Sequence, residues 1–376
     1  MTVILIAVAA VLILALILLA TLCVRLADEM RPGAAQDLTL GGLEGTRFAR
    51  YADTLIPDIL SMRELPWEDV YISSFDGLKL HGRVVRGGGD AVILMHGYHS
   101  SPENDFAGIA QWYVRHGFTV IAADERSHGL SEGGKITFGT REQRDAVAWA
   151  QYAGYILGSE HIWMHGASMG AVSSLLAMKD GYPEAVAGVI ADCPFDSLGD
   201  LFSFTMKKRT NIPPSLFRSI STLSRAIMLG PEFANTSCRS AVAESGLPVL
   251  LFEGGGDHTV PPGSAESICG ACKGRCTLVT IPAVSYTHLS VSARPWAARM
   301  ASSAAFARPC STSSKKASVR CKFVSCVKPP RPPVSPRSRS RASSSARREG
   351  SEKFMAMKSR MSIHLEAPAR AERDAV

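Results

Sequence analysis

The sequence predicts an α/β fold with a doubly wound, mostly parallel sheet, preceded by one transmembrane helix. Short apolar runs, each the length of a buried strand, alternate over residues 67–282 with helical patterns. Most of these runs end in a polar or glycine-rich loop. Because reactive groups gather at the carboxyl ends of parallel strands, functional residues are expected in these loops.

The N-terminal residues predict a membrane anchor. Thr2 to Val24 carry no charge and consist mainly of Val, Ile, Leu and Ala, which is enough to cross a bilayer as a helix. A cleaved signal peptide is the alternative, but no Lys or Arg precedes the apolar run and no small-x-small cleavage site follows it. We therefore expect an uncleaved anchor at 2–24 and a linker at 25–66, with the side of the membrane left open.

Charge separates the body of the chain from its C-terminal region. Residues 290–376 contain 19 basic and 5 acidic residues, whereas residues 1–289 contain 22 basic and 29 acidic residues. The overall basic character thus belongs to the C-terminal region, and the acidic body disfavours nucleic acid as a partner.

Cysteine usage predicts neither a metal centre nor a complete disulfide framework. The total of nine is odd, and Cys269, Cys272 and Cys276 lack a fourth ligand at zinc-finger spacing. We interpret these three as incidental thiols and expect no metal or organic cofactor.

The predicted sheet opens with a hairpin whose strands, within residues 70–72 and 78–85, flank Asp76-Gly77. A helix over 106–116 is expected to stop at Gly117, and Thr140 with Gln143 resembles a capping box for the helix that runs through Ala150. The further strands are expected at residues 91–95, 119–123, 162–164, 186–191, 248–252 and 277–281.

A candidate nucleophile lies between an apolar run and an alanine- and leucine-rich helix. Gly166-Ala167-Ser168-Met169-Gly170 has the G-x-S-x-G pattern, in which the glycines permit a sharp turn that exposes the serine oxygen. A chance match in a glycine-rich chain is the alternative, but the strand before it and the helix after it favour the turn. Ser168 is therefore the expected nucleophile.

The loop after residues 91–95 begins His96-Gly97-Tyr98-His99 and is a candidate oxyanion loop. In acyl-transfer enzymes of this architecture, one backbone N–H of this loop and the N–H after the nucleophile hold the developing negative charge. Tyr98 and Met169 would supply these groups, whereas His96 and His99 are expected to be structural. The alternative is that His96-Gly97 simply ends a strand.

Four ordered motifs resemble the α/β-hydrolase superfamily, in particular bacterial membrane-anchored relatives of serine aminopeptidases, esterases and lipases. They are the oxyanion loop at His96-Gly97, the D-x-R-x-H-G-x-S segment from Asp124 to Ser131, the Gly166–Gly170 turn and the G-x-x-D-x-x-V-P loop from Gly254 to Pro261. The resemblance covers residues 67–282 and implies an α/β-hydrolase fold with a helical lid at about 196–245.

The resemblance also implies a catalytic triad. Ser168 would attack a carbonyl carbon, a histidine would take its proton, and Asp257 would orient that histidine. Asp257 could instead be a turn residue after three glycines. The neighbouring His258 is expected to be a bystander.

The histidine is where this sequence departs from the family. His288 is the candidate, but it follows Pro282 about two residues later than usual, with no clear closing helix after it. Beyond Leu289 the composition changes to Ser, Arg, Ala and Pro, which cannot form a packed core. Residues 283–376 could be a basic tail that binds anionic lipid or RNA, a tail without a partner, or foreign sequence joined to an incomplete domain, and we favour the last.

The function that the sequence predicts is hydrolysis of an ester, thioester or amide by a membrane-anchored serine hydrolase, with a small acyl-type or peptide substrate. A catalytically inactive membrane protein that keeps the fold as a binding module, with the basic tail as its contact, is the alternative. The oligomeric state stays open.

Overall fold

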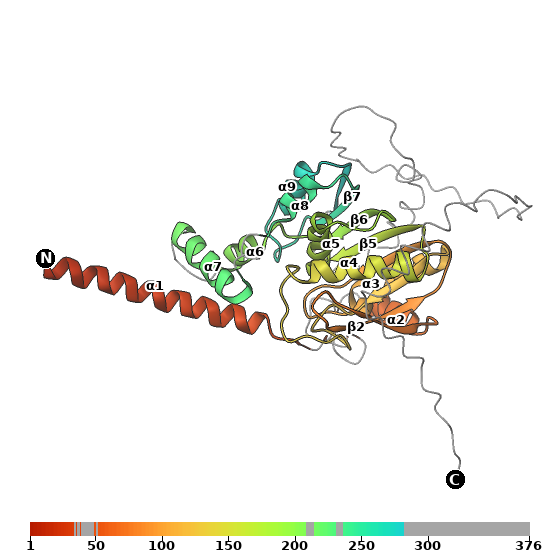
Figure 1. The fold of residues 1–376 in the computed structure, drawn as a ribbon, viewed down its shortest axis with the longest axis horizontal. Coiled ribbons are helices and arrows are strands. Elements are labelled where there is room, and N and C mark those ends of the chain that lie inside the picture. The colour runs from red at the N-terminus through yellow and green to blue at the C-terminus, as the bar shows by residue number, and fades with distance from the viewer. Residues whose placement is uncertain are drawn as a thin grey trace, which may run out of the picture. The chain divides into compact units, whose positions relative to one another are not determined.

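The computed structural model describes residues 1–33, 35, 38, 49, 52–207, 214–230 and 236–281. Its centre is one eight-stranded sheet with the strand order β1-β2-β4-β3-β5-β6-β7-β8 (Figure 1). The first two strands pair antiparallel, β2 joins β4 antiparallel, and every other neighbouring pair is parallel. The strands are β1 (Glu68–Ser73), β2 (Lys79–Val85), β3 (Asp90–Met95), β4 (Thr119–Ala123), β5 (His161–Ala167), β6 (Val186–Asp192), β7 (Val249–Gly254) and β8 (Cys276–Ile281).

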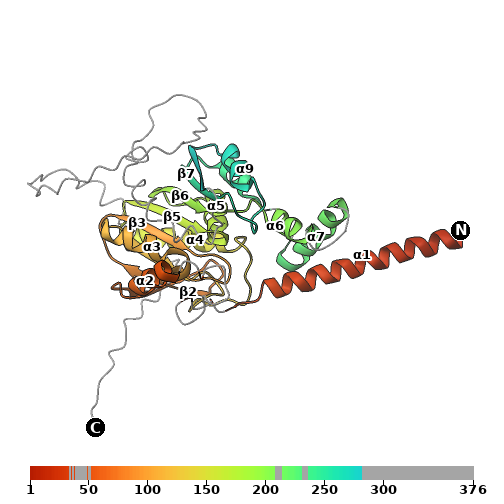
Figure 2. The ribbon, with the colours of Figure 1, turned by 180° about the vertical axis from the view of Figure 1, so that it is seen from behind.

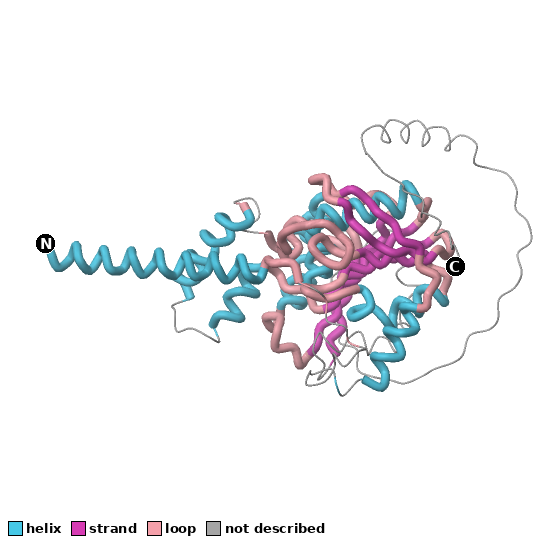
Figure 3. Tube along the Cα trace, turned by 90° about the horizontal axis from the view of Figure 1, so that it is seen from below, coloured by secondary structure: helices cyan, strands magenta, loops and turns pink. Residues whose placement is uncertain are grey.

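Helices cover both faces of the sheet (Figures 2 and 3). The described helices are α1 (Thr2–Glu29), α2 (Ala52–Arg63), α3 (Pro102–Arg115), α4 (Glu142–Gln151) with a π-helical turn η2 (Tyr152–Ile156), α5 (Met169–Asp180), α6 (Leu198–Lys207), α7 (Pro214–Leu229), α8 (Cys238–Glu244) and α9 (Ser264–Ala271). Alternation along β3 divides the core: Val92 and Leu94 pack with α2 and α3, whereas Ile93 and Met95 pack with α4, α5 and α8. The predicted doubly wound, mostly parallel sheet is confirmed.

Two predicted helix starts are wrong. Helix α3 begins at Pro102, four residues before the expected start, because Ser101 caps it by accepting a hydrogen bond from Asn104 N at 3.3 Å and proline suits the first turn. The Thr140–Gln143 capping box does not form. Thr140 Oγ1 donates to Thr137 O instead, and the Glu142 carboxylate accepts from the Thr137 and Gly139 amides.

The interpretation of the cysteines also needs correction. Cys269 and Cys276 form a disulfide, because the turn from α9 into β8 brings their Cα atoms to 5.6 Å. Cys272 is a free thiol. Within the described part of the chain, no group of His, Cys, Asp and Glu side chains could hold a metal ion.

Helix α1 contains one candidate span, Ile4–Arg25, which by length and composition alone could cross a membrane. Between β6 and β7 the chain inserts α6, α7 and α8. Helix α8 packs into the core with α5 through Cys238, Ala241 and Val242, so α6 and α7 are the part of this insertion that could form a lid. The predicted linker at 25–66 contains the end of α1 and the whole of α2, and its residues 34, 36–37, 39–48 and 50–51 lie outside the described part of the chain.

Candidate active site

Ser168 lies at a sharp turn between β5 and α5. Its backbone has φ 50° and ψ −109°, a conformation that a residue with a Cβ atom rarely adopts. Both flanking glycines are required by close approach: a Cβ on Gly166 would lie 2.2 Å from Gly170 O, and a Cβ on Gly170 would lie 2.0 Å from Met95 O. The Ser168 side chain is half-buried and has no hydrogen-bond partner among the described residues. The turn therefore presents the hydroxyl at the end of the strand.

Gly170→Ala is expected to lower the free energy of unfolding by about 3 kcal/mol, because the new methyl group would overlap the backbone that joins β3 to the candidate oxyanion loop. Chemical denaturation measures this change. Gly270→Ala, in α9 with open space around the position, is the matched control and should be neutral or stabilising by up to about 1 kcal/mol. Equal stability of both variants would contradict the close approach.

The loop after β3 is held beside the turn. Gly97 N donates to Asp105 Oδ2 at 2.6 Å, His99 N donates to His128 Nε2 at 3.1 Å, and the ring of His96 accepts from Glu125 N at 3.1 Å. The backbone amides of Tyr98 and Met169 have no acceptor among the described residues. His96 and His99 thus make contacts with the backbone, and their structural role stays a prediction.

Backbone strain is concentrated at this edge of the sheet. Among the described residues, five that are not glycine have positive φ: His99, Ser127, Phe138, Ser168 and Cys193. Four of them follow the carboxyl ends of β3, β4, β5 and β6, and Phe138 stacks on Tyr98 at 5.2 Å between ring centroids. Such conformations cost about 1–3 kcal/mol each and gather at functional sites. Of these five positions, the sequence pattern indicates only the sharp turn at Ser168.

His128 is a buried neutral histidine. Burial, together with the neighbouring His96, lowers its pKa to about 3. Its Nδ1–H donates to Arg126 O at 3.0 Å, which leaves Nε2 free to accept from the His99 amide. Protonation would abolish that acceptor and release the candidate oxyanion loop.

A pH dependence of stability follows. The folded pKa of His128 lies below its unfolded value of about 6.5, so the unfolded chain binds the proton first and stability falls as the pH drops below about 6.5. Between pH 7.5 and 5 this histidine should cost about 2 kcal/mol. His128→Gln keeps an acceptor for His99 N but does not titrate, so it should lose about 2 kcal/mol less stability over this pH range than the parent. Chemical denaturation at several pH values measures the difference. If the free energies of unfolding of the two proteins fell equally with pH, His128 would not be the cause of the loss.

Hydrogen bonds and ion pairs of buried side chains hold the D-x-R-x-H-G-x-S segment, from Asp124 to Ser131, in place. Asp124 accepts from His81 Nδ1 at 2.7 Å and from Leu130 N at 2.9 Å, and although burial acts to raise its pKa, these bonds hold the pKa below its ordinary value. Arg126 forms ion pairs with Asp145 and Asp76. Gly129 is required here, since a Cβ would lie 2.1 Å from Asp124 Oδ2.

Asp257 lies in the loop after β7, at the same edge of the sheet. Its Oδ1 accepts from Thr259 N at 2.7 Å and Val260 N at 3.1 Å, which makes it a turn residue as well as a candidate acid. Two backbone bonds connect the intervening strands: Ser168 N donates to Asp192 O, and Cys193 N donates to Phe252 O. His258 is exposed. Topology therefore brings Ser168, Tyr98, Met169 and Asp257 to one edge, and His288 lies outside the described residues.

Glu29, the last residue of α1, contacts the candidate oxyanion loop, and no sequence pattern indicates this contact. The Tyr98 hydroxyl donates to Glu29 O at 2.9 Å and lies 3.0 Å from Glu29 Oε2, and burial together with this carboxylate raises the pKa of Tyr98. Ile136 N donates to Met30 O at 2.8 Å in the same region. The predicted linker offered no pattern for these contacts, because they depend on tertiary structure.

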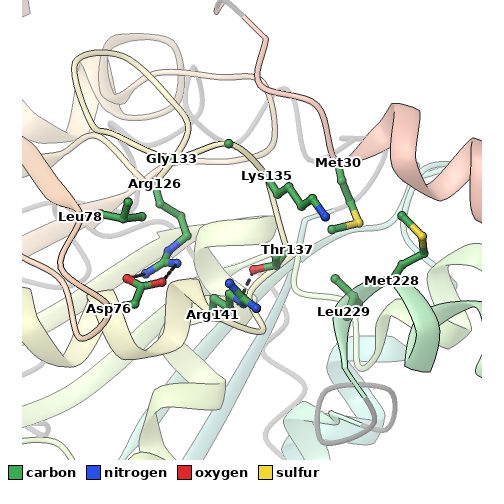
Figure 4. Close-up of a pocket in the computed structure, with 11 residues that line it drawn as sticks. Met30, Asp76, Leu78, Arg126, Gly133, Lys135, Thr137, Arg141, Met228 and Leu229 are labelled. Carbon is green, nitrogen blue, oxygen red and sulfur yellow. Dashed lines mark hydrogen bonds and ion pairs between the residues drawn. The ribbon is translucent and has the colours of Figure 1, made fainter.

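A cavity of about 280 Å³ opens next to this junction (Figure 4). The Arg126–Asp76 ion pair lies at one side of it, and Met30 from the end of α1 and Met228 and Leu229 from α7 lie at the other. Ser168 is not one of its lining residues. The cavity is therefore separate from the nucleophile turn.

Comparison with known proteins agrees with this architecture. Residues 89–228 match the family model described as serine aminopeptidase, S33. Polyketide transferase ATR5 of Stachybotrys chlorohalonatus is 32% identical over 134 residues, which cover 34% of this chain and 44% of that protein. The uncharacterised protein YqkD of Bacillus subtilis is 24% identical over 182 residues, covering 48% of this chain and 59% of YqkD. The chain thus spans about half the length of these curated relatives.

Solved structures show the same fold. The Pyrococcus furiosus esterase Pf2001, in its C2221 crystal form, superposes with a TM-score of 0.54 at 22% identity, covering 73% of this chain and 96% of the esterase. Its likeness concerns the fold alone. The strand order, the turn at Ser168 and the family match over residues 89–228 together make this chain similar to proteins of the α/β-hydrolase superfamily.

Proposed function

We propose that this protein is a serine hydrolase that cleaves an ester, thioester or amide through an acyl-enzyme intermediate. The observation that carries the proposal is Ser168, whose half-buried hydroxyl lies at a strained turn beside two backbone amides without acceptors in the described structure. Backbone strain of this kind gathers at functional sites, and unlike Ser127, whose hydroxyl donates to Lys135 O, Ser168 has no side-chain hydrogen bond among the described residues. The family match over residues 89–228 supports the same chemistry.

In the proposed reaction the Ser168 oxygen attacks the substrate carbonyl carbon while a histidine, His288 by our prediction, takes the hydroxyl proton. The N–H groups of Tyr98 and Met169 donate to the oxyanion that forms, and each such donor contributes on the order of 3 kcal/mol in related sites. The intermediate collapses to an acyl-serine as the imidazolium protonates the leaving group. Water, activated by the same histidine, then releases the acid and restores Ser168.

The base is tested by a pair of histidine variants. His288→Ala should lower kcat by about 10³–10⁴-fold, since no other group would accept the serine proton. His258→Ala, an exposed neighbour of Asp257, is the control and should keep nearly full activity. Loss of activity in His258→Ala but not in His288→Ala would assign the base to the other histidine.

The proposal as a whole is tested with a fluorophosphonate probe and a short acyl ester, on the full chain in detergent or vesicles. We expect covalent labelling, with the adduct on the peptide that contains Ser168, and turnover of the ester. Absence of labelling together with salt-sensitive binding of RNA or anionic lipid would overturn it and favour a binding module.

We also propose that α1 anchors the protein in a membrane. The span Ile4–Arg25 carries no charge before Arg25, and most of its large apolar side chains are exposed, as they would be toward lipid. Carbonate extraction of membranes from expressing cells tests this. An integral protein stays in the pellet, and release into the supernatant would contradict anchoring.

A further inference from the structure

Helix α7 buries Ile220 and Leu229 but exposes two large apolar side chains on one face while it buries polar side chains on another. Leu223 and Ile227, four residues apart on one face, are 50% and 59% exposed. Ser221, Ser224 and Arg225, on another face, are only 1%, 3% and 7% exposed. A helix that faces water on its outer side shows the opposite pattern, with leucines inward and serines and arginines outward. The outer face of α7 is therefore suited to an apolar environment.

The inward polar side needs no water, because its groups bond to one another. Ser224 Oγ donates to Ser221 O at 2.8 Å, Arg225 Nη1 donates to Ser221 Oγ at 2.7 Å, and Arg225 Nη2 donates to Thr222 Oγ1 at 3.1 Å. Helix α6 packs closely over this arginine, since a Cβ on Gly199 would lie 2.9 Å from Arg225 Nη2. The intrahelical bonds give these buried polar groups partners, and the packing of α6 over Arg225 holds this side of α7 inward.

Helix α7 lies beside the candidate anchor, as Figures 1 and 2 both show. Ile220 of α7 packs against Leu22 of α1, and both side chains are buried. Ala15, Leu18 and Leu19, which lie one and two turns earlier in α1, pack against this pair. All four α1 residues belong to the span Ile4–Arg25. The exposed face of α7 is consequently continuous with the apolar surface of α1.

Positive charge lies where the two helices end. Lys135 and Arg141, both exposed, line the cavity that Met30 at the end of α1 shares with Met228 and Leu229 of α7 (Figure 4). Cationic side chains beside an apolar surface complement the anionic headgroups of a leaflet.

We propose that α7 lies in the interfacial layer of the bilayer beside α1, with Leu223 and Ile227 among the lipid acyl chains. An amphipathic helix at this level buries its apolar face about 5–10 Å into the headgroup and acyl boundary. The proposal rests on the anchor and the hydrolase function proposed above and adds a substrate class: acyl esters of membrane lipids, which would reach the site from the bilayer side of α6 and α7.

Tryptophan quenching tests the placement without reference to activity. The full chain carrying Leu223→Trp is reconstituted in phosphatidylcholine and phosphatidylglycerol vesicles, some of whose acyl chains are brominated near the headgroup. The added fluorescence, relative to the parent chain, should be quenched at least twofold. Leu60→Trp, at a similarly exposed leucine of α2, is the matched control and should be unaffected.

Two results would overturn the placement. Equal emission of Leu223→Trp with and without bromine would place α7 in water. Emission that is unquenched but changes with the ratio of protein to lipid would assign the face to a second copy of the chain.

Activity provides the second measurement. The double variant Leu223→Asn, Ile227→Asn should turn over a long-chain ester embedded in vesicles about tenfold more slowly while hydrolysing a short water-soluble ester normally, and Leu60→Asn should change neither rate. Equal loss on both esters would overturn the substrate class. If the parent chain hydrolyses neither ester, the proposed function fails, whereas the quenching result still decides where α7 lies.

Discussion

Ser168→Ala is expected to abolish fluorophosphonate labelling and to lower kcat by about 10⁴-fold or more. The variant loses the oxygen that would form the acyl-enzyme, and no neighbouring hydroxyl occupies the same strained turn after β5. Alanine keeps the Cβ atom and the backbone conformation, so the free energy of unfolding should stay within about 0.5 kcal/mol of the parent value. Labelling in gel, ester turnover and chemical denaturation measure the three quantities.

A serine elsewhere in the same protein supplies the control. Ser267→Ala in α9 removes a hydroxyl from a helix with no proposed role and should leave labelling and kcat unchanged. Persistent labelling of Ser168→Ala would show that the probe reacts at another site and would remove Ser168 from the mechanism. A large loss of stability would instead mean that the hydroxyl has a structural partner.

Local patterns explain why the sheet and the turn could be predicted. Buried stretches such as residues 91–95 and 120–123 are continuous apolar runs, and Gly166 and Gly170 are required by backbone contacts that no side chain could tolerate. The hairpin at Asp76-Gly77 is likewise determined within a few residues, with Gly77 at φ 85°. For these elements the sequence and the structure agree because the determining interactions are short in range.

The features that escaped prediction depend on how helices, strands and loops are assembled. Glu29 and Tyr98 are 69 residues apart and meet only because the end of α1 packs beside the loop after β3. The Cys269–Cys276 disulfide requires the turn between α9 and β8, and the strain at Phe138 and Cys193 requires the assembled edge of the sheet. Composition and periodicity carry no information about such contacts.

The sequence alone also does not predict which face of helix α7 is exposed. Its apolar residues, which include Leu223 and Ile227, fit equally with packing inside a lid or with an outward surface when only the sequence is considered. The exposure of Leu223 and Ile227, beside the burial of Ser221 and Arg225, distinguishes the two. Which side faces the body is decided by α6 and α1, not by the helix itself.

The second large effect is expected for Asp257→Asn, which separates two roles of one side chain. Asparagine keeps an Oδ1 atom that can accept from Thr259 N and Val260 N, so the turn after β7 should survive. It lacks the negative charge that would orient a neutral imidazole and stabilise the imidazolium. We therefore expect kcat to fall by about 10³–10⁴-fold with little change in the free energy of unfolding.

Asp257→Ala completes the comparison, because it removes the charge and the acceptor together. It should match the asparagine variant in kcat and in addition lose about 1–2 kcal/mol of stability, since the two turn amides would lose their acceptor. Full activity of Asp257→Asn beside an unstable Asp257→Ala would make Asp257 a turn residue only. The acid of the triad would then have to lie elsewhere at this edge, and Asp192, whose Oδ2 already contacts His165 Nε2 at 3.2 Å, would be the next carboxylate to test.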